Sequence, residues 1–428
     1  MTVFQSIAII LAFSALVSYL NHRYIRLPST MVLMAAGISF SAVLIMLGKL
    51  EIIDTTHAVA YVTAFDFTGV LLHGMLAFLL FAGALHVNIS ELKSQWKPVV
   101  ALSTVGVMMS TFLTGGLFWL AAQALGIELA FIYALLFGAL IAPTDPIAVM
   151  GVMKQANAPK SLETKIVGES LFNDGVGVVV FMTLFGIAVG GTEPTFAGVS
   201  LFLLTEVLGG ALLGGALGYG TFLLLRSIDE YQVEVLLTLA LTAGGYALAE
   251  ALHVSAPIAI VVAGLIIGNH GRSFAMSEKT RSHLDTFWKL VDDILNAVLF
   301  VLIGVEMIAL SFERTYLAMG LIAIVITLLA RLISVWLPIR VMGRQGGFAK
   351  GTVRILTWGG LRGGISIALA LSVTAAKERE LIVFATYIVV IWSILGQGLT
   401  LSALIRKMLP LPVVEMTDNS DKDEKNKG

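Results

Sequence analysis

The amino-acid sequence predicts an all-α protein that crosses a membrane many times. Of its 428 residues, 57% are hydrophobic and only 13% are charged, and the mean hydropathy is +0.92. Soluble domains are about 25% charged and 45–50% apolar, so this composition is that of a polytopic membrane protein. The second observation is a series of apolar runs of about 20 residues, the length that a helix needs to cross a ~30 Å hydrocarbon core.

Thirteen such runs predict thirteen transmembrane helices. The first lacks the basic stretch and the small-residue cleavage site of a signal peptide, so we expect it to be retained as a helix. Six helices, one linker helix and six more would start the second half in the opposite orientation, as two inverted repeats. The runs begin near Val3, Thr30, Phe67, Pro98, Ala130, Leu162, Phe196, Tyr231, Ser255, Trp288, Tyr316, Thr352 and Leu381.

Basic residues predict the orientation of the chain. Of the 27 lysines and arginines, 21 lie in loops or terminal segments on one side of the predicted helices and four on the other. The cytoplasmic loops of membrane proteins carry an excess of lysine and arginine. We therefore expect an outside amino terminus and a cytoplasmic carboxyl terminus in the cell (plasma or inner) membrane. Residues 1–412 are expected to form one transmembrane domain, and the mixed-charge residues 413–428 a disordered cytoplasmic tail. Arg331 lies inside a span, toward its cytoplasmic end; its side chain can extend to the interface, and its role stays open.

Two of the predicted helices carry strong helix breakers. Pro143 and Pro146 lie in the middle of the fifth run, and four glycines surround Arg362 in the twelfth. These are the fifth helices of the two halves, so we expect discontinuous helices 5 and 12 to cross at mid-membrane, as in secondary transporters. Asp145 would then neutralise helix amino-terminal ends, and Arg362 carboxyl-terminal ends. Arg362 can also form a pair with a second buried charge, Glu169.

The sixth run carries Glu169, Ser170, Asn173 and Asp174 within six positions. At about 100° per residue, all four lie within roughly 140° of one helix face. Polar groups at this depth are unfavourable in a bilayer, which indicates an ion or proton site. Gly177 removes a side chain from the same face, where another backbone or an ion would need to approach.

Three motifs together resemble those of the sodium/proton antiporters of the NhaP and NHE type, the electroneutral branch of the monovalent cation:proton antiporters. They are Thr144-Asp145-Pro146, Gly168-Glu169-Ser170-Leu171-Phe172-Asn173-Asp174 and Gly360-Leu361-Arg362-Gly363. The resemblance covers essentially the whole chain apart from the tail. It implies a moving core of helices 4–6 and 11–13, and a scaffold of the remaining helices that forms a homodimer.

The resemblance also implies the residues of an ion site. The Thr144 carbonyl and the side chains of Asp145, Ser170 and Asp174 would bind sodium. Asn173 and Glu169 would hold the site together, with Glu169 acting through Arg362. The neutral Asn173 beside Asp174 implies one-for-one exchange, and no acidic residue lies in the middle of the third helix to add a ligand.

We therefore expect a sodium/proton antiporter with a role in pH homeostasis, in which cation and proton compete for Asp174 by alternating access. It would be a secondary active transporter and not an enzyme, with no cofactor and no nucleic-acid partner. The transported ions would be the proton and a monovalent cation, which is sodium or else lithium or potassium. Potassium/proton exchange remains the nearest alternative, because oxygen ligands alone do not select the cation. An intramembrane aspartyl protease would need Tyr-Asp and Gly-x-Gly-Asp motifs, which the aspartates here lack. A simple channel is the third alternative.

Overall fold

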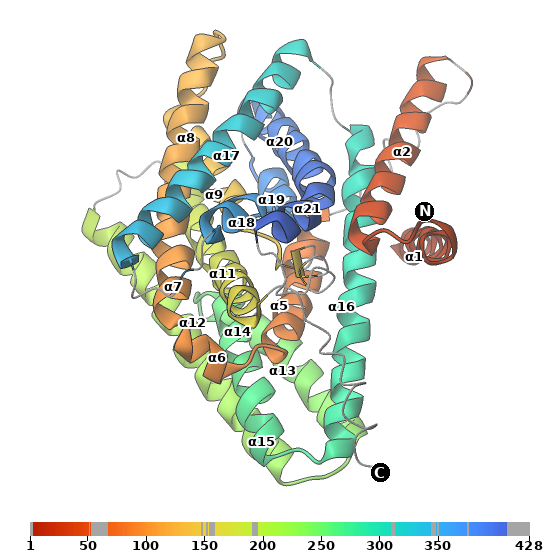
Figure 1. The fold of residues 1–428 in the computed structure, drawn as a ribbon, viewed down its shortest axis with the longest axis vertical. Coiled ribbons are helices and arrows are strands. Elements are labelled where there is room, and N and C mark those ends of the chain that lie inside the picture. Colours follow the sequence, from red (N-terminus) through yellow and green to blue (C-terminus); the bar gives the residue numbers. More distant parts are fainter. Residues whose placement is uncertain are drawn as a thin grey trace, which may run out of the picture.

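The computed structural model describes residues 3–50, 52, 67–146, 149–150, 153, 159–190, 196–309, 313–343, 348, 351–374 and 376–408. Over these residues the ordered elements are helices, and none is a β-strand (Figure 1). The predicted all-α fold class is therefore confirmed. The predicted tail, residues 413–428, lies outside the described residues.

The described residues in the first half of the chain form a series of helices. They are α1 (Val3–Leu20), α2 (Ser29–Lys49), α4 (Phe67–Gly69), α5 (Leu76–Leu85), α6 (Ile89–Ser94), α7 (Trp96–Ala101), α8 (Val107–Ala124), α9 (Phe131–Ile141) and α11 (Lys160–Gly190). π-Helical segments extend three of them, at Asn21–Ile25, Val70–Met75 and Leu102–Gly106.

The linker and the second half continue the pattern. They contain α12 (Phe196–Arg226), α13 (Tyr231–Ala251), α14 (Ala256–Ile266), α15 (Arg272–Phe274), α16 (Glu278–Glu306), α17 (Arg314–Met342), α18 (Thr352–Trp358), α19 (Gly364–Leu371), α20 (Ala376–Ile391) and α21 (Gly398–Met408). π-Helical segments lie at Ile267–Gly271 and Trp392–Gln397, and a 3-10 turn at Met307–Ala309.

Each predicted run coincides with a helix or with a broken pair of helices in the described part of the chain. Among these residues, eight helices are long and apolar enough to cross a membrane. The shorter apolar helices are Val70–Leu85, Phe131–Ile141 and Ala256–Gly271. The remaining predicted spans are α16, whose first half is charged, and the broken pair α18 and α19. The helices are thus compatible with the thirteen predicted crossings.

The two predicted breaks are present, and they contact one another. α9 ends at Ile141, residues 142–145 are not helical, and helix resumes at Pro146. α18 ends at Trp358 and α19 begins at Gly364. The Asp145 N–H donates to the Leu361 carbonyl at 2.7 Å, so a backbone hydrogen bond joins the two interruptions. Figure 1 places α9, α11, α18 and α19 at the centre of the bundle.

The long helix α11 passes directly beside the first break. A Cβ at Gly177 would lie 2.3 Å from Pro143 Cγ, a distance that real Cβ atoms do not adopt. Gly177 is therefore the residue that lets the proline-containing segment lie against α11. We expected another backbone or an ion at this position, and the atoms that approach are those of the Pro143 ring.

The helices pack as two groups that meet at α11. α8 packs against α9 and α17, and α17 packs against α18 and α20. In the second group α12 packs against α13 and α14, α14 against α5, and α16 against α2, α5 and α13. α11 contacts α9 of the first group and both α12 and α14 of the second.

Candidate functional site

The side chain of Asn173 holds the unwound part of the first break. Its Oδ1 accepts a hydrogen bond from the Thr144 backbone N–H at 3.2 Å, and its Nδ2 donates to Thr144 Oγ1 at 2.8 Å. The break leaves the Thr144 amide without a helical partner, and a buried amide without any partner is unfavourable. Asn173 is fully buried and supplies that partner, which agrees with the supporting role expected for it.

Ser170 completes this small network. Its hydroxyl lies 2.9 Å from Thr144 Oγ1, and either oxygen can donate. Thr144 and Ser170 are both buried, but only Thr144 lines the adjacent cavity. The structure therefore places Ser170 behind Thr144, and its predicted role as a direct cation ligand stays a prediction.

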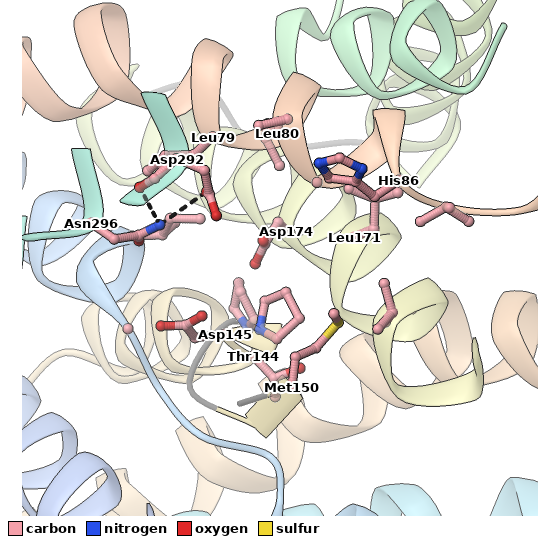
Figure 2. A pocket seen from close by; sticks show the side chains of 18 of the residues that line it. Leu79, Leu80, His86, Thr144, Asp145, Met150, Leu171, Asp174, Asp292 and Asn296 are labelled. Atoms are coloured by element: carbon pink, nitrogen blue, oxygen red, sulfur yellow. Dashed lines mark hydrogen bonds between the residues drawn. The ribbon is translucent and has the colours of Figure 1, made fainter. Parts of the chain in front are cut away.

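Asp145 and Asp174 face one cavity of about 670 Å³ from two different elements (Figure 2). Asp145 belongs to the first break and Asp174 to α11, and their carboxylates interact electrostatically. Among the residues that the structure describes, none donates a hydrogen bond to the Asp174 carboxylate. Two carboxylates from separate helices thus meet where the first helix is broken, as expected.

Asp145 also lies at the amino-terminal end of α19. A Cβ at Gly363 would lie 2.8 Å from Asp145 Oδ2, so this approach requires glycine at that position. The free N–H groups at a helix amino terminus carry a partial positive charge, which a carboxylate stabilises. The predicted neutralisation of a helix amino terminus by Asp145 agrees with this placement.

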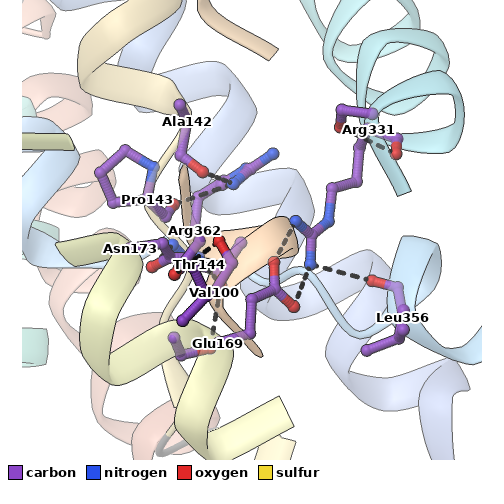
Figure 3. Close-up of polar contacts among 12 residues, drawn as sticks. Val100, Ala142, Pro143, Thr144, Glu169, Asn173, Arg331, Leu356 and Arg362 are labelled. Atoms are coloured by element: carbon purple, nitrogen blue, oxygen red, sulfur yellow. Dashed lines mark hydrogen bonds and ion pairs between the residues drawn. The ribbon is translucent and has the colours of Figure 1, made fainter. Parts of the chain in front are cut away.

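Arg362 binds the carboxyl-terminal end of α9. Its Nη1 donates to the Ala142 carbonyl at 2.6 Å and to the Pro143 carbonyl at 2.9 Å (Figure 3). These carbonyls lose their helical partners at the break, and the end of a helix carries a partial negative charge. These contacts agree with the expectation that Arg362 neutralises a carboxyl-terminal end. Its backbone N–H also donates to Ser393 Oγ at 2.9 Å, which fixes the second break.

The predicted pairing of Glu169 with Arg362 is wrong. Glu169 pairs with Arg331 of α17, with Nη1–Oε1 at 2.5 Å and Nη2–Oε2 at 2.9 Å (Figure 3). Arg362 stays within electrostatic range of Glu169, but its side-chain hydrogen bonds go to the α9 carbonyls. Geometry explains the difference. The Arg362 guanidinium already binds the carbonyls at the first break, whereas the Arg331 guanidinium binds the Glu169 carboxylate in a bidentate arrangement.

Arg331, whose role the sequence leaves open, does not extend to the cytoplasmic interface. Its side chain is 6% exposed and that of Glu169 is 1% exposed, so the pair is sealed inside the protein. Arg331 Nη2 lies 3.4 Å from the Leu356 carbonyl as well, which connects α17 to α18. Sequence inspection missed this role because no feature of the local pattern shows which face of α17 meets α11.

The cavity wall from the third predicted span is apolar where the site lies. Leu79, Leu80 and Gly83 of α5 line it, and His86 follows at the helix end. In addition, Asp292 and Asn296 of α16 line the same cavity. Among the described residues, no group of three or more His, Cys, Asp or Glu side chains is placed to hold a metal ion.

The chain is similar to known proteins over nearly its whole length. The family described as "Sodium/hydrogen exchanger, transmembrane" matches residues 10–407. The Na(+)/H(+) antiporter NhaP of Pseudomonas aeruginosa is 50% identical over 407 residues, which are 94% of this chain and 96% of that protein. The Na(+)/H(+) antiporter NhaH of Halobacillus dabanensis is 34% identical over 414 residues, covering 95% of this chain and 98% of its own.

A solved structure shows the same fold. The sodium proton antiporter MjNhaP1 from Methanocaldococcus jannaschii matches with a TM-score of 0.76 at 20% sequence identity, covering 95% of this chain and 98% of that chain. The family resemblance drawn from the three motifs is confirmed by these matches. The chain is a multi-pass membrane protein that belongs to the sodium/hydrogen exchanger family.

Proposed function

We propose that this protein exchanges sodium for protons across the cell membrane, with one cation exchanged for one proton at Asp174. The observation that carries the proposal is the Asp174 carboxylate, which faces the cavity beside Asp145 and accepts no hydrogen bond from the described residues. Carboxylate, hydroxyl and carbonyl oxygens are the ligands that a hard cation prefers. Relatives that match nearly the full length of this chain are named sodium/proton antiporters, which supports sodium as the cargo.

Competition for Asp174 would couple the two fluxes. The carboxylate binds a cation when it is ionised and carries a proton when it is neutral, so the two cargoes exclude one another. An empty ionised site is unfavourable in an apolar barrier, so it would not cross the membrane, whereas the loaded or protonated site would. Exchange follows from this restriction, while Asp145 lies against the amino terminus of α19.

One-for-one exchange is supported by the neighbours of Asp174. Asn173 is neutral, and both ends of its amide are occupied by Thr144. Glu169 and Arg331 neutralise one another, and Arg362 is held by carbonyls. If each half-cycle carries one positive charge with one ionised carboxylate, the two half-cycles move equal charge, and the membrane potential has little influence on steady turnover.

We assign the group that contains α8, α9 and α17 to the moving core, and the other group to the scaffold, which are the two parts that the family resemblance implies. The core would contain α7–α9, α11 and α17–α21, and the scaffold the other helices, from which the homodimer would form. The core contains both breaks, so its movement would carry the whole site past the scaffold wall. The amino terminus would face outside and the carboxyl terminus the cytoplasm, as the basic residues predict.

The experiment that tests this function uses purified protein in vesicles with a proton gradient and a fluorescent pH indicator. Sodium, lithium and potassium salts are added in turn, and cation-dependent proton movement is recorded. We expect a response to sodium, with a weaker response or none to potassium, and none from Asp174→Asn. A response to potassium alone would favour potassium/proton exchange, and coupled exchange retained in Asp174→Asn would contradict the role of that carboxylate.

A second arm of the experiment tests electroneutrality. Steady exchange is measured at several membrane potentials set by potassium and valinomycin. We expect the rate to stay the same within the precision of the assay, whereas a marked dependence on potential would refute one-for-one exchange.

A further inference from the structure

Asp292 and Asn296 lie on one face of α16 and line the cavity that contains the candidate ion site. They are four positions apart, so their directions on the helix differ by only about 40°. Asp145 and Asp174 line the same cavity. Figure 2 shows the side chains of Asp292 and Asn296 next to one another, joined by the hydrogen bonds to the amide.

The orientation of the Asn296 amide is fixed by chemistry. Its Nδ2 donates to the Asp292 backbone carbonyl at 2.8 Å and to Asp292 Oδ1 at 2.9 Å. Both partners are acceptors, so the nitrogen end must face them and the oxygen end must point away. Asn296 is 4% exposed, and its Oδ1 has no hydrogen-bond partner among the described residues. A buried acceptor in this state calls for a partner, which can be a donating water molecule or a cation.

The charges around this oxygen favour a cation. Lys289 lines the cavity near Asp292, yet among the described residues no lysine, arginine or histidine forms an ion pair with Asp292. Asp293 lines the cavity as well, and the carboxylates of Asp145 and Asp292 repel one another. A concave space lined by several carboxylates concentrates cations.

We propose that Asp292 and Asn296 form an outer cation station, at which a partly hydrated monovalent alkali cation binds before it reaches Asp174. Asn296 Oδ1 and the Asp292 carboxylate would each contribute an oxygen, and water would supply the rest of the coordination shell. The station rests on the proposed function only for its purpose, which is to raise cation occupancy next to the transport site. Its existence can be tested without exchange.

Binding of radioactive sodium to the purified full-length Asp174→Asn protein tests the station in the absence of the inner site. We expect saturable binding to remain, and to weaken about tenfold when Asn296→Leu or Asp292→Asn is added, as expected for the loss of one contact to a charged group. Asp293→Asn is the matched control, because it removes the same charge from a side chain about 100° away on α16. It should change binding less than twofold.

Two outcomes of this measurement would overturn the proposal. If Asp174→Asn binds no sodium, water alone satisfies Asn296. If Asp293→Asn weakens binding as much as Asp292→Asn does, the cavity attracts cations only through its total charge. Both outcomes leave the proposed exchange untouched, since neither depends on transport.

Transport by Asn296→Leu in the otherwise unchanged chain gives an independent readout. The apparent KM for sodium should rise about tenfold, while turnover at saturating sodium stays within about twofold of the unaltered protein. Preserved turnover would show that the variant folds. An unchanged KM would contradict the station, and if the variant loses transport altogether, the binding measurement still decides the question.

Discussion

The ion pair between Glu169 and Arg331 can be tested by mutation, because the sequence suggests Arg362 as the partner of Glu169 and the structure shows Arg331. Glu169→Gln would leave the Arg331 guanidinium buried without its countercharge. The pair is almost fully sealed and has two charge-assisted hydrogen bonds, at 2.5 and 2.9 Å. Breaking a buried pair from one side costs about 3–5 kcal/mol, so we expect a clear loss of stability.

A double-mutant cycle isolates this interaction. Glu169→Gln, Arg331→Met and the double variant are purified, and their apparent melting temperatures and denaturant midpoints are compared. We expect each single change to lower the melting temperature by roughly 3–10 °C, and the double variant to recover part of that loss. The coupling energy should be about 2–3 kcal/mol, at the upper end of that for residues in contact.

Arg362→Met provides the control for the cycle. Arg362 binds the Ala142 and Pro143 carbonyls, so its removal should destabilise the protein by a separate route. Its coupling to Glu169→Gln should stay below about 1 kcal/mol, since the two groups interact only at a distance. A coupling to Arg362 larger than that to Arg331 would refute the assignment of partners.

Two further predictions concern the break itself. Gly177→Ala would place a Cβ 2.3 Å from Pro143, so we expect the variant to lose exchange or to fail to fold. In the control Gly186→Ala, on the same helix, the new Cβ meets nothing within 4 Å, and this variant should behave as the unaltered protein. Equal exchange by both variants would contradict the close packing at Gly177. Asn173→Ala would leave the buried Thr144 N–H without a hydrogen-bond partner, which costs about 1–3 kcal/mol of stability. We expect the apparent sodium affinity in the vesicle assay to weaken about tenfold. An unchanged affinity would show that the Asn173 side chain does not shape the site.

Local features of the sequence predicted the architecture well. The number and length of the apolar runs follow from the thickness of a bilayer, so the helices coincide with them. The breaks follow from Pro143 and Pro146 and from the glycines around Arg362, because these residues act on their own turn of helix. Gly177 was predicted in the same way, since a missing side chain on a polar face indicates a close approach.

Contacts between distant helices were predictable only where the helix dipole decides them. Asp145 and Arg362 match opposite ends of broken helices, and both follow that rule in the structure. Arg331 does not, because its position in a uniformly apolar helix carries no information about which helix it meets. The same limit applies to Ser170: its spacing places it on the polar face of α11, but only the structure shows that Thr144 separates it from the cavity.

Asp292 and Asn296 represent an intermediate case. Their spacing on α16 can be read directly and places them on one face. That this face closes the cavity of Asp174 depends on the packing of α16 against α5 and α19, which the sequence does not reveal.

If sodium and a proton compete for the single carboxylate of Asp174, the sodium dependence of exchange must change with pH, and it can be measured at a series of pH values. In vesicles held at zero membrane potential, the apparent KM for sodium should rise about tenfold for each unit of falling pH on the acidic side, as one proton displaces one cation. Maximal turnover should be restored by saturating sodium. An apparent KM that does not change with pH, or a loss of turnover that sodium cannot restore, would contradict the account.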